Sequence, residues 1–160
     1  MTEFVWPYGQ QADPLLMEYL VGAFESVRKT GDLGSSTGFE IPNDRMHWSN
    51  HVRDKKLVKC AEEYERYPDD GKLKFFCFGL HSIDYERANC WDVLEEFAER
   101  FGGRDGEFYY APVRDIFRYS NAVDALRING NVVENPSDIT LYITVDGEKI
   151  TVPPASTLKL

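Results

Sequence analysis

The sequence has little that would suit the chain to a membrane or to nucleic acid. No stretch comes near the roughly 18 apolar residues that a membrane-spanning helix needs. Its 18 Lys and Arg are outnumbered by 27 Asp and Glu, which gives a formal net charge of −9. General binding of polyanions depends on basic patches that release counterions. We therefore expect neither a nucleic-acid partner nor a membrane partner.

Cysteine is also scarce, and it is not arranged for disulfides or metal binding. Cys60, Cys77 and Cys90 are an odd number without CxxC spacing. Cys77 alternates with phenylalanines in an apolar run, which is typical of a small core residue. The first residues, MTEFVWPYGQQADP, have neither the basic start nor the apolar segment of a signal peptide. These features predict a reduced, cytoplasmic protein.

Two common catalytic loops are missing as well. Residues 31–38, GDLGSSTG, lack the lysine of a phosphate-binding P-loop, and no clear strand precedes them. No GxSxG nucleophile motif occurs. Because the chain has only three histidines, acid–base chemistry has few side chains on which to depend: His47, His51 and His81.

The chain does contain alternating helical and strand patterns. Asp13 is a plausible cap for a helix that starts at Pro14. Helices are also predicted over 55–67, over 91–101 before Gly102-Gly103, and after Pro112. Strands are predicted over 73–80, which is apolar nearly throughout, and over 108–111, whereas 30–37 and 42–54 read as loops. This order predicts an α/β protein with parallel strands.

The C-terminal part has a different pattern. Residues 139–145 and 149–152 flank Asp146-Gly147, a strong signal for a β-hairpin. We expect a small antiparallel β hairpin within a β-rich appendage over 127–160. At 160 residues the whole chain is most simply a single domain.

His81 is the first candidate for chemistry. It follows the predicted apolar strand, at the end where functional side chains gather in parallel sheets. Ser82 and Asp84 come directly after it. A histidine there could be a general acid or base, or it could be half-buried and satisfied by a backbone carbonyl.

Two further segments are candidates for a binding site. Trp6-Pro7-Tyr8-Gly9 follows a strand-like FVW, and it is either a functional loop at a strand end or a simple turn. His47 and His51 would share one face of a helix and could then bind a metal. Their segment lacks a helical apolar pattern and an obvious third ligand, so we predict no metal site in this chain. Trp48, between them, could line a pocket, stack on a sugar or belong to the core.

The motifs occur in an order that resembles a known family. They are WPYG at Trp6, IPNDRMHW at Ile41, FGLHS at Phe78, NCWDVLEEFAERFGGRD at Asn89, FYYA at Phe108 and ENPSDITLYITVDG at Glu134. Their order and spacing resemble the C-terminal half of polysaccharide deacetylases, the NodB-like carbohydrate esterases, over nearly the whole chain. The resemblance implies a partial, distorted (β/α) barrel.

The resemblance also implies an activity and roles for individual residues. The family removes N- or O-acetyl groups from carbohydrates by metal-assisted hydrolysis, and such an enzyme is a hydrolase of carbon–nitrogen (amide) bonds when the acetyl group is on nitrogen. His81 matches the histidine that acts as general acid toward the leaving amine, and the Tyr8 backbone matches an oxyanion donor. Substrate contacts would come from Trp6, Pro7, Gly9, Trp48 and Leu80.

The departures from the family pattern limit what the chain is expected to do alone. The early Thr-Phe-Asp-Asp-Gly type motif, which supplies the base and a metal ligand, is absent, and no His-x-x-x-His pair precedes Pro7. FGLHS also has Leu80 between the glycine and the histidine. We therefore expect no cofactor in this chain alone, with zinc or another divalent metal present only if a partner completes the site.

Two classes of function follow from this comparison. The first is an incomplete deacetylase that is completed by a homo-oligomer, such as a dimer, or by a complementary N-terminal half. The second is a non-catalytic module that binds saccharide or acts as a structural partner. Either class implies a role in carbohydrate metabolism.

Overall fold

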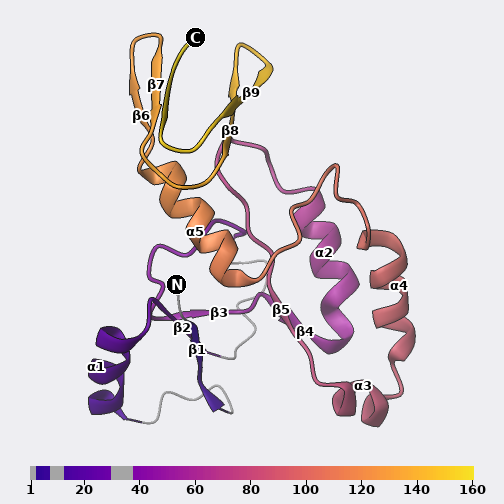
Figure 1. Cartoon of the computed structure of the whole chain (residues 1–160). Helices are drawn as coiled ribbons and strands as arrows, with labels where there is room; N and C mark the ends of the chain where they lie inside the picture. The colour runs from indigo at the N-terminus through magenta and orange to yellow at the C-terminus, as the bar shows by residue number, and fades with distance from the viewer. Residues whose placement is uncertain (1–2, 8–12, 30–37) are drawn as a thin grey trace. The chain divides into compact units, whose positions relative to one another are not determined.

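The chain is a mixed α/β protein in two compact units. The computed structural model describes residues 3–7, 13–29 and 38–160. The first unit is Met1–Tyr110 and the second is Ala111–Leu160. All strand ladders of the first unit are parallel and all those of the second are antiparallel (Figure 1). The described strands form no closed barrel. None of the described helices combines the length and apolar character needed to cross a membrane.

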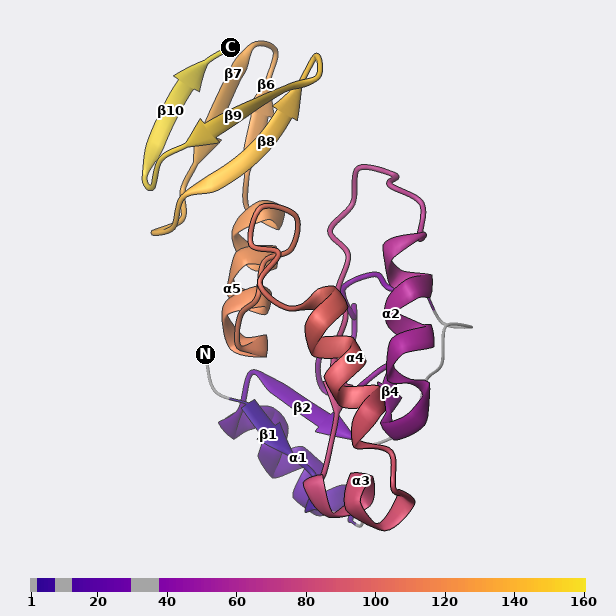
Figure 2. The same cartoon turned by 90° about the vertical axis from the view of Figure 1, so that its right-hand side faces the viewer.

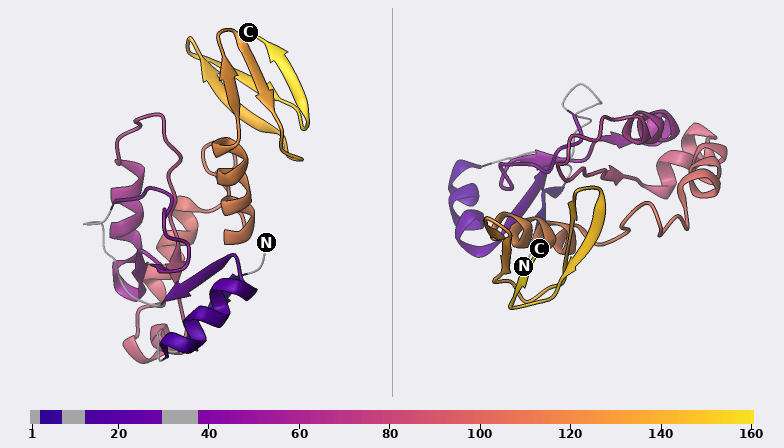
Figure 3. Two further views of the ribbon diagram at one scale, coloured as in Figure 1. Left: turned by 90° about the vertical axis from the view of Figure 1, so that its left-hand side faces the viewer. Right: turned by 90° about the horizontal axis from the view of Figure 1, so that it is seen from above.

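The first unit opens with a strand–helix–strand motif. Strand β1 (Glu3–Val5) pairs in parallel with β2 (Ser26–Lys29), and α1 (Pro14–Ala23) connects them. As predicted, Asp13 caps α1, because its carboxylate accepts the Leu15 amide hydrogen at 2.8 Å. Helix α1 lies along β1 and β2 (Figure 3). Its inner face, Met17 and Leu20, is buried with Val27 of β2 and with Trp6, which follows β1, and Phe4 and Phe24 pack beside them.

The predicted loop over 42–54 is confirmed for residues 42–47, but two short strands follow at 48–49 and 52–53. Strand β3 (Trp48–Ser49) pairs with β2, and β4 (Val52–Arg53) pairs with β5 (Phe78–Gly79). Each ladder is only two residues long. Such short pairings leave no alternating pattern in the sequence, so tertiary contacts decide them.

The predicted strand over 73–80 is much shorter in the structure, where only β5 is regular. Upstream of β5 the chain makes single backbone bonds, from Phe75 N to Phe39 O and from His51 N to Cys77 O, both at 2.7 Å. The segment is apolar because it supplies rings to an aromatic cluster with Phe39, Tyr64 and Phe97. Burial against side chains, rather than burial within a sheet, therefore explains its composition.

Three helices complete the first unit. They are α2 (Leu57–Glu65), preceded by a 3-10 turn at Asp54–Lys56, α3 (Ser82–Ala88) and α4 (Trp91–Phe101). Helices α2 and α4 lie side by side (Figure 2). Helix α4 ends at Gly102 as predicted, and Gly103 adopts a φ of 67° that favours glycine. Helix α3 was not predicted.

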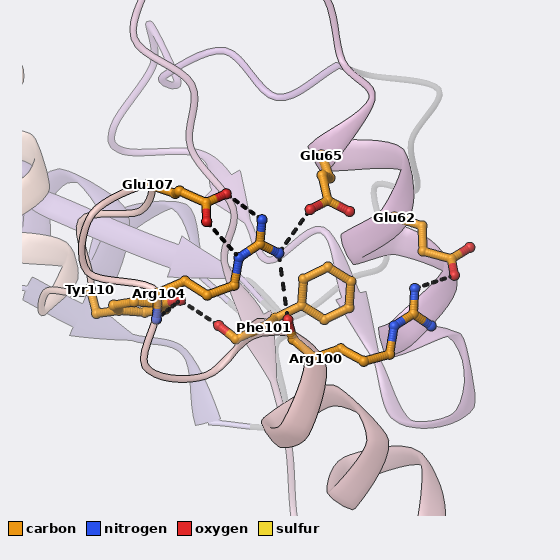
Figure 4. A network of polar contacts seen from close by, with 7 residues as sticks. All are labelled: Glu62, Glu65, Arg100, Phe101, Arg104, Glu107 and Tyr110. Carbon is orange, nitrogen blue, oxygen red and sulfur yellow. Dashed lines mark hydrogen bonds and ion pairs between the residues drawn. The ribbon is translucent and has the colours of Figure 1, made fainter.

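Polar contacts hold residues 104–110, and the predicted strand over 108–111 is absent. The Arg104 guanidinium binds Glu65 at 2.8 Å and also binds Glu107, and it lies 4.7 Å from the ring centroid of Phe108. The Tyr110 hydroxyl donates to the carbonyl of Phe101 (Figure 4). The neighbouring Arg100 joins Glu62 of α2 at 2.6 Å. Side-chain contacts therefore hold this segment in place, where backbone hydrogen bonds of a strand over 108–111 were expected.

The second unit contains one helix and two small antiparallel sheets. Helix α5 (Val113–Asp124) precedes β6 (Arg127–Asn129), β7 (Val132–Asn135), β8 (Leu141–Val145), β9 (Glu148–Val152) and β10 (Ser156–Lys159). The predicted hairpin is confirmed, because β8 pairs with β9 around Asp146 and Gly147, both at positive φ. The second sheet has the order β10-β7-β6.

Asn135 joins the two sheets of the second unit. Its amide nitrogen lies within 2.9–3.2 Å of the carbonyl oxygens of Ile139, Val152 and Pro153. Its amide oxygen accepts from the backbone and the hydroxyl of Ser137, at 3.0 and 2.6 Å. The residue is fully buried. A buried carbonyl that is left without a hydrogen bond costs more free energy than a formed bond contributes. The Asn135 side chain therefore fixes the ends of β7 and β9 together.

We expect Asn135→Asp to destabilise the second unit by on the order of 3 kcal/mol, because it buries a charge and removes both donors from the carbonyl oxygens. Amide hydrogen exchange across β7 and β9 measures the effect. The matched control is Asn131→Asp, the same change at an exposed position, which should alter stability by less than about 0.5 kcal/mol. Equal exchange in the two variants would contradict the role of Asn135.

Candidate functional site

Two candidate segments directly follow parallel strands of the first unit. Trp6 and Pro7 follow β1, and Leu80 and His81 follow β5. Each segment therefore leaves the carboxyl end of its own strand, the first in the β1-β2-β3 sheet and the second in the β4-β5 sheet. Tyr8 and Gly9, the other residues of the predicted loop, lie outside the described residues.

His81 is held by a carboxylate at the start of α3. It is the residue before the helix, in extended conformation, and its carbonyl accepts the Asp84 amide hydrogen at 2.9 Å. Its Nδ1 lies 3.1 Å from Asp84 Oδ2. The side chain of His81 is 64% exposed and that of Asp84 is 40% exposed. Since Asp84 engages Nδ1, Nε2 is the ring atom that would exchange a proton with a ligand.

The surroundings of this histidine are partly apolar and open. Leu80 and Ile83 are exposed on either side of it in the sequence. At the other end of α3, the exposed Trp91 donates from Nε1 to Glu86 Oε2 at 2.8 Å. Helix α3 and the residues on either side of it therefore carry an acid–base group, His81. They also carry exposed apolar side chains and an indole whose orientation is fixed by Glu86.

The two tryptophans predicted to contact substrate lie in the core. Trp6 is buried, and its ring packs edge-on against Phe4. Trp48 is also buried, packs edge-on against Phe75 and donates from Nε1 to Ser26 Oγ at 2.8 Å. These positions agree with the core alternative for Trp48. Contact of either ring with a substrate stays a prediction.

The remaining two histidines lie in different environments. His47 is exposed and pairs with Asp44 at 2.9 Å, whereas His51 is buried. His51 Nδ1 lies 3.1 Å from the Cys77 amide nitrogen, which donates to it. In the described part of the chain, no three His, Cys, Asp or Glu side chains come together as metal ligands. These residues therefore do not fit the zinc or other divalent metal that the family resemblance implies.

Sequence reasoning did not find the structural role of His51. Burial lowers the pKa of its ring, although the Cys77 carbonyl oxygen, 3.3 Å from Nδ1, opposes this by favouring a protonated ring. Burial also raises the pKa of the Cys77 thiol to about 11, which keeps the thiol protonated, although Cys77 is only partly buried and is not one of the core residues. The apolar run over 73–80, which contains Cys77, was the one sequence feature that could have pointed to a buried partner. The sequence does not show, however, which residue of that run lies next to His51.

A polar group on the parallel sheet was also missed. Glu3 on β1 lies 3.7 Å from Arg28 on β2, and the Arg28 guanidinium lies 5.9 Å from the ring centroid of Trp48. Burial raises the pKa of Glu3, and the positive charge of Arg28 partly offsets this. Because the three residues are far apart in the sequence, no motif could have revealed them.

Comparisons of the chain with known protein families, with curated proteins and with solved structures found no match.

The buried, neutral His51 makes a prediction about pH. The unfolded ring has a pKa near 6.5, above that of the folded ring, so the unfolded state takes up a proton first as the pH falls. The stability that His51 contributes is present above about pH 6.5 and is lost as the pH falls from there through the lower pKa of the folded ring. Urea unfolding followed by tryptophan fluorescence reports the first unit, which contains all three tryptophans.

We expect the loss between about pH 7.5 and 5.5 to shrink in His51→Asn, which keeps an acceptor for the Cys77 amide without a titratable ring. His47→Asn is the control, because His47 is exposed and should leave the loss unchanged. The carboxylates with lowered pKa values act only at more acidic pH, below about 4.5. The same loss in all three proteins would refute the role of His51.

Proposed function

We propose that the chain is a polysaccharide deacetylase-like protein that acts on N- or O-acetylated carbohydrate and is incomplete alone. The observation that carries the proposal is the His81–Asp84 pair at the carboxyl end of β5, 3.1 Å apart and open to solvent. The position agrees with the place of the general acid in the family that the motifs resemble. A cytoplasmic location remains part of the proposal.

The order of the strands supports a segment of a distorted (β/α) barrel. The strands pair in the order in which they occur in the chain, β1-β2-β3 and then β4-β5. Helix α1 connects β1 to β2, and α2 connects β4 to β5. Consecutive strand–helix units pair in this way in a barrel, whereas doubly wound sheets reverse their order at a switch point. The outer edges of β1 and β5 are then the places where further strands would join.

The proposed role of His81 is proton donation. Hydrolysis of an acetamide releases an amine, which is a poor leaving group until it gains a proton. The protonated His81 would supply it from Nε2 while Asp84 holds Nδ1, and a positioned acid of this kind contributes roughly 10²–10⁴-fold in rate. The base and the divalent metal would belong to a complementary N-terminal half or another partner, because the described residues do not offer a ligand set.

A saccharide-binding module without catalysis is the second candidate. The observation that favours it is Trp91, whose exposed indole is oriented by Glu86 and lies 5.8 Å from the ring of Tyr85. An aromatic face with a polar neighbour suits the apolar face and hydroxyl groups of a sugar ring. Such a module would bind acetylated sugar through this region without using His81 as an acid.

An acetylated oligosaccharide titration tests the proposal. With a tetramer of N-acetylglucosamine, we expect the imidazole signals of His81 and the amide signals of Leu80 and Asp84 to shift in NMR spectra of the whole chain. The signals of the exposed His47, which pairs with Asp44 in the same way, are the internal control. Because the sequence lacks the family's base and metal motifs, no acetate should be released, with or without added zinc.

The outcomes separate the two candidates. Shifts centred on Trp91 without a change at His81 would favour the binding module. Zinc-dependent acetate release by the isolated chain that is lost in His81→Ala would contradict the claim that the chain is incomplete. No shift at any residue up to millimolar sugar would refute both candidates.

A further inference from the structure

The ring of His51 faces both polar groups of the Cys77 backbone. Its Nδ1 lies 3.1 Å from the Cys77 amide nitrogen and 3.3 Å from the Cys77 carbonyl oxygen. A neutral ring whose proton is on Nε2 accepts a hydrogen bond at Nδ1, whereas a charged ring donates one there. The same atom therefore has a different partner in each protonation state, the amide when the ring is neutral and the carbonyl when it is charged.

The surroundings of this ring are apolar. Phe39 stacks on it with ring centroids 5.1 Å apart, and the centroids of Phe75 and Phe76 lie at 5.7 and 6.0 Å. Only 4% of His51 is exposed. A charge on so deeply buried a ring has to be compensated by a hydrogen bond. The Cys77 carbonyl is in place to provide it, because an oxygen that already accepts from the His51 amide at 2.7 Å has a second lone pair.

Neighbouring charges do not set the state of the ring. The titratable groups packed around it are the Cys77 thiol and the hydroxyl of Tyr64, whose ring packs on Phe39, and burial raises the pKa of both, so both stay neutral. Burial and the Cys77 backbone are what act on the pKa of His51. The charged side chains on its own strand segment, on the two segments packed against it and near Cys77 are Arg53, Glu40, Lys74, Glu3 and Arg28.

The residues next to His51 contact the end of β5 directly. Strand β4 pairs with β5, whose last residue is Gly79 (Figure 1). The Asn50 amide lies against the same glycine, since a Cβ there would be 3.4 Å from Asn50 Nδ2. His81 follows two residues later. A displacement of Cys77 relative to His51 therefore reaches the start of α3 through a continuous set of contacts, of which the His51 ring is the part with two discrete states.

We propose that His51 is a positioning residue for His81 and that a proton on the His51 ring changes this position. The neutral ring holds the Cys77 amide. The charged ring turns to the Cys77 carbonyl and draws it closer, because a charged hydrogen bond is about 2.7–2.9 Å long, against the 3.3 Å of the neutral arrangement. The end of β5 moves with Cys77, and His81 moves with the end of β5. Only the use of His81 as a proton donor rests on the proposed function.

NMR spectra of the whole chain between about pH 7.5 and 5.5 test the switch. The protein used is His81→Asn, so that titration of His81 does not shift the signals of its neighbours. We expect the His51 ring to carry its proton on Nε2 at the upper pH and to gain a second one on Nδ1 in the folded chain as the pH falls. Exchange of the Cys77 amide hydrogen, corrected for the intrinsic effect of pH, should then become about tenfold faster. The amide signals of Gly79 and Leu80 should move with the same midpoint as the ring.

The matched control adds His51→Asn, which keeps an acceptor for the Cys77 amide but cannot titrate, so the signals of Gly79 and Leu80 should stay constant. Equal movement of these signals in the control would overturn the proposal. So would a His51 ring that stays neutral until the chain unfolds, or one that gains its proton while Gly79 and Leu80 do not move; both results come from the first protein and do not require the control to fold. No sugar is present, so a failure of sugar binding leaves this result unchanged, and a failure here leaves His81 as a proton donor.

Discussion

The parallel arrangement of the first unit depends on the pairing of His51 with Cys77. Residues 48–53 pair with β2 through their first part and with β5 through their last part, and His51 lies at the break between them. There its amide donates to the Cys77 carbonyl at 2.7 Å, and its ring accepts the Cys77 amide hydrogen at 3.1 Å. The His51 side chain thus accepts the Cys77 amide hydrogen, which a backbone carbonyl would accept in a continuous strand ladder. Without it a buried amide would stand unpaired, which costs about 1–3 kcal/mol, and β5 would lose its register against the sheet.

The position of His81 follows from that register. Because β5 runs parallel to β4, the residues that follow it leave at the carboxyl end of this two-stranded sheet, and α3 begins there. The sequence raised two alternatives for His81, an acid–base group or a ring satisfied by the backbone. The structure contains both arrangements, but the backbone-bonded ring is His51, while His81 is exposed beside Asp84. His51 and His81 therefore have opposite environments: the first is buried and bonded to the backbone, and the second is exposed beside a carboxylate.

Polar side chains also stabilise segments for which the sequence predicted strand pairing. Arg104 and Tyr110 hold the segment before Ala111, where a strand was predicted. In the second unit, Asn135 connects two sheets that share no ladder. Such groups satisfy several backbone carbonyls at once, and their partners are chosen by the folded chain. A pattern of apolar residues carries no information about them.

The sequence by itself determined the features that depend on near neighbours. Asp13-Pro14 starts α1, the glycine pair ends α4, and Asp146-Gly147 turns the hairpin, because capping and positive φ are set within a few residues. The alternation of helices and strands likewise predicted parallel pairing. Only the tertiary structure decided that β3 and β4 form where a loop was predicted, and that His51 is buried between them. These outcomes depend on contacts such as that of His51 with Cys77, 26 positions apart, and neither propensity nor periodicity specifies which distant residue will be the partner.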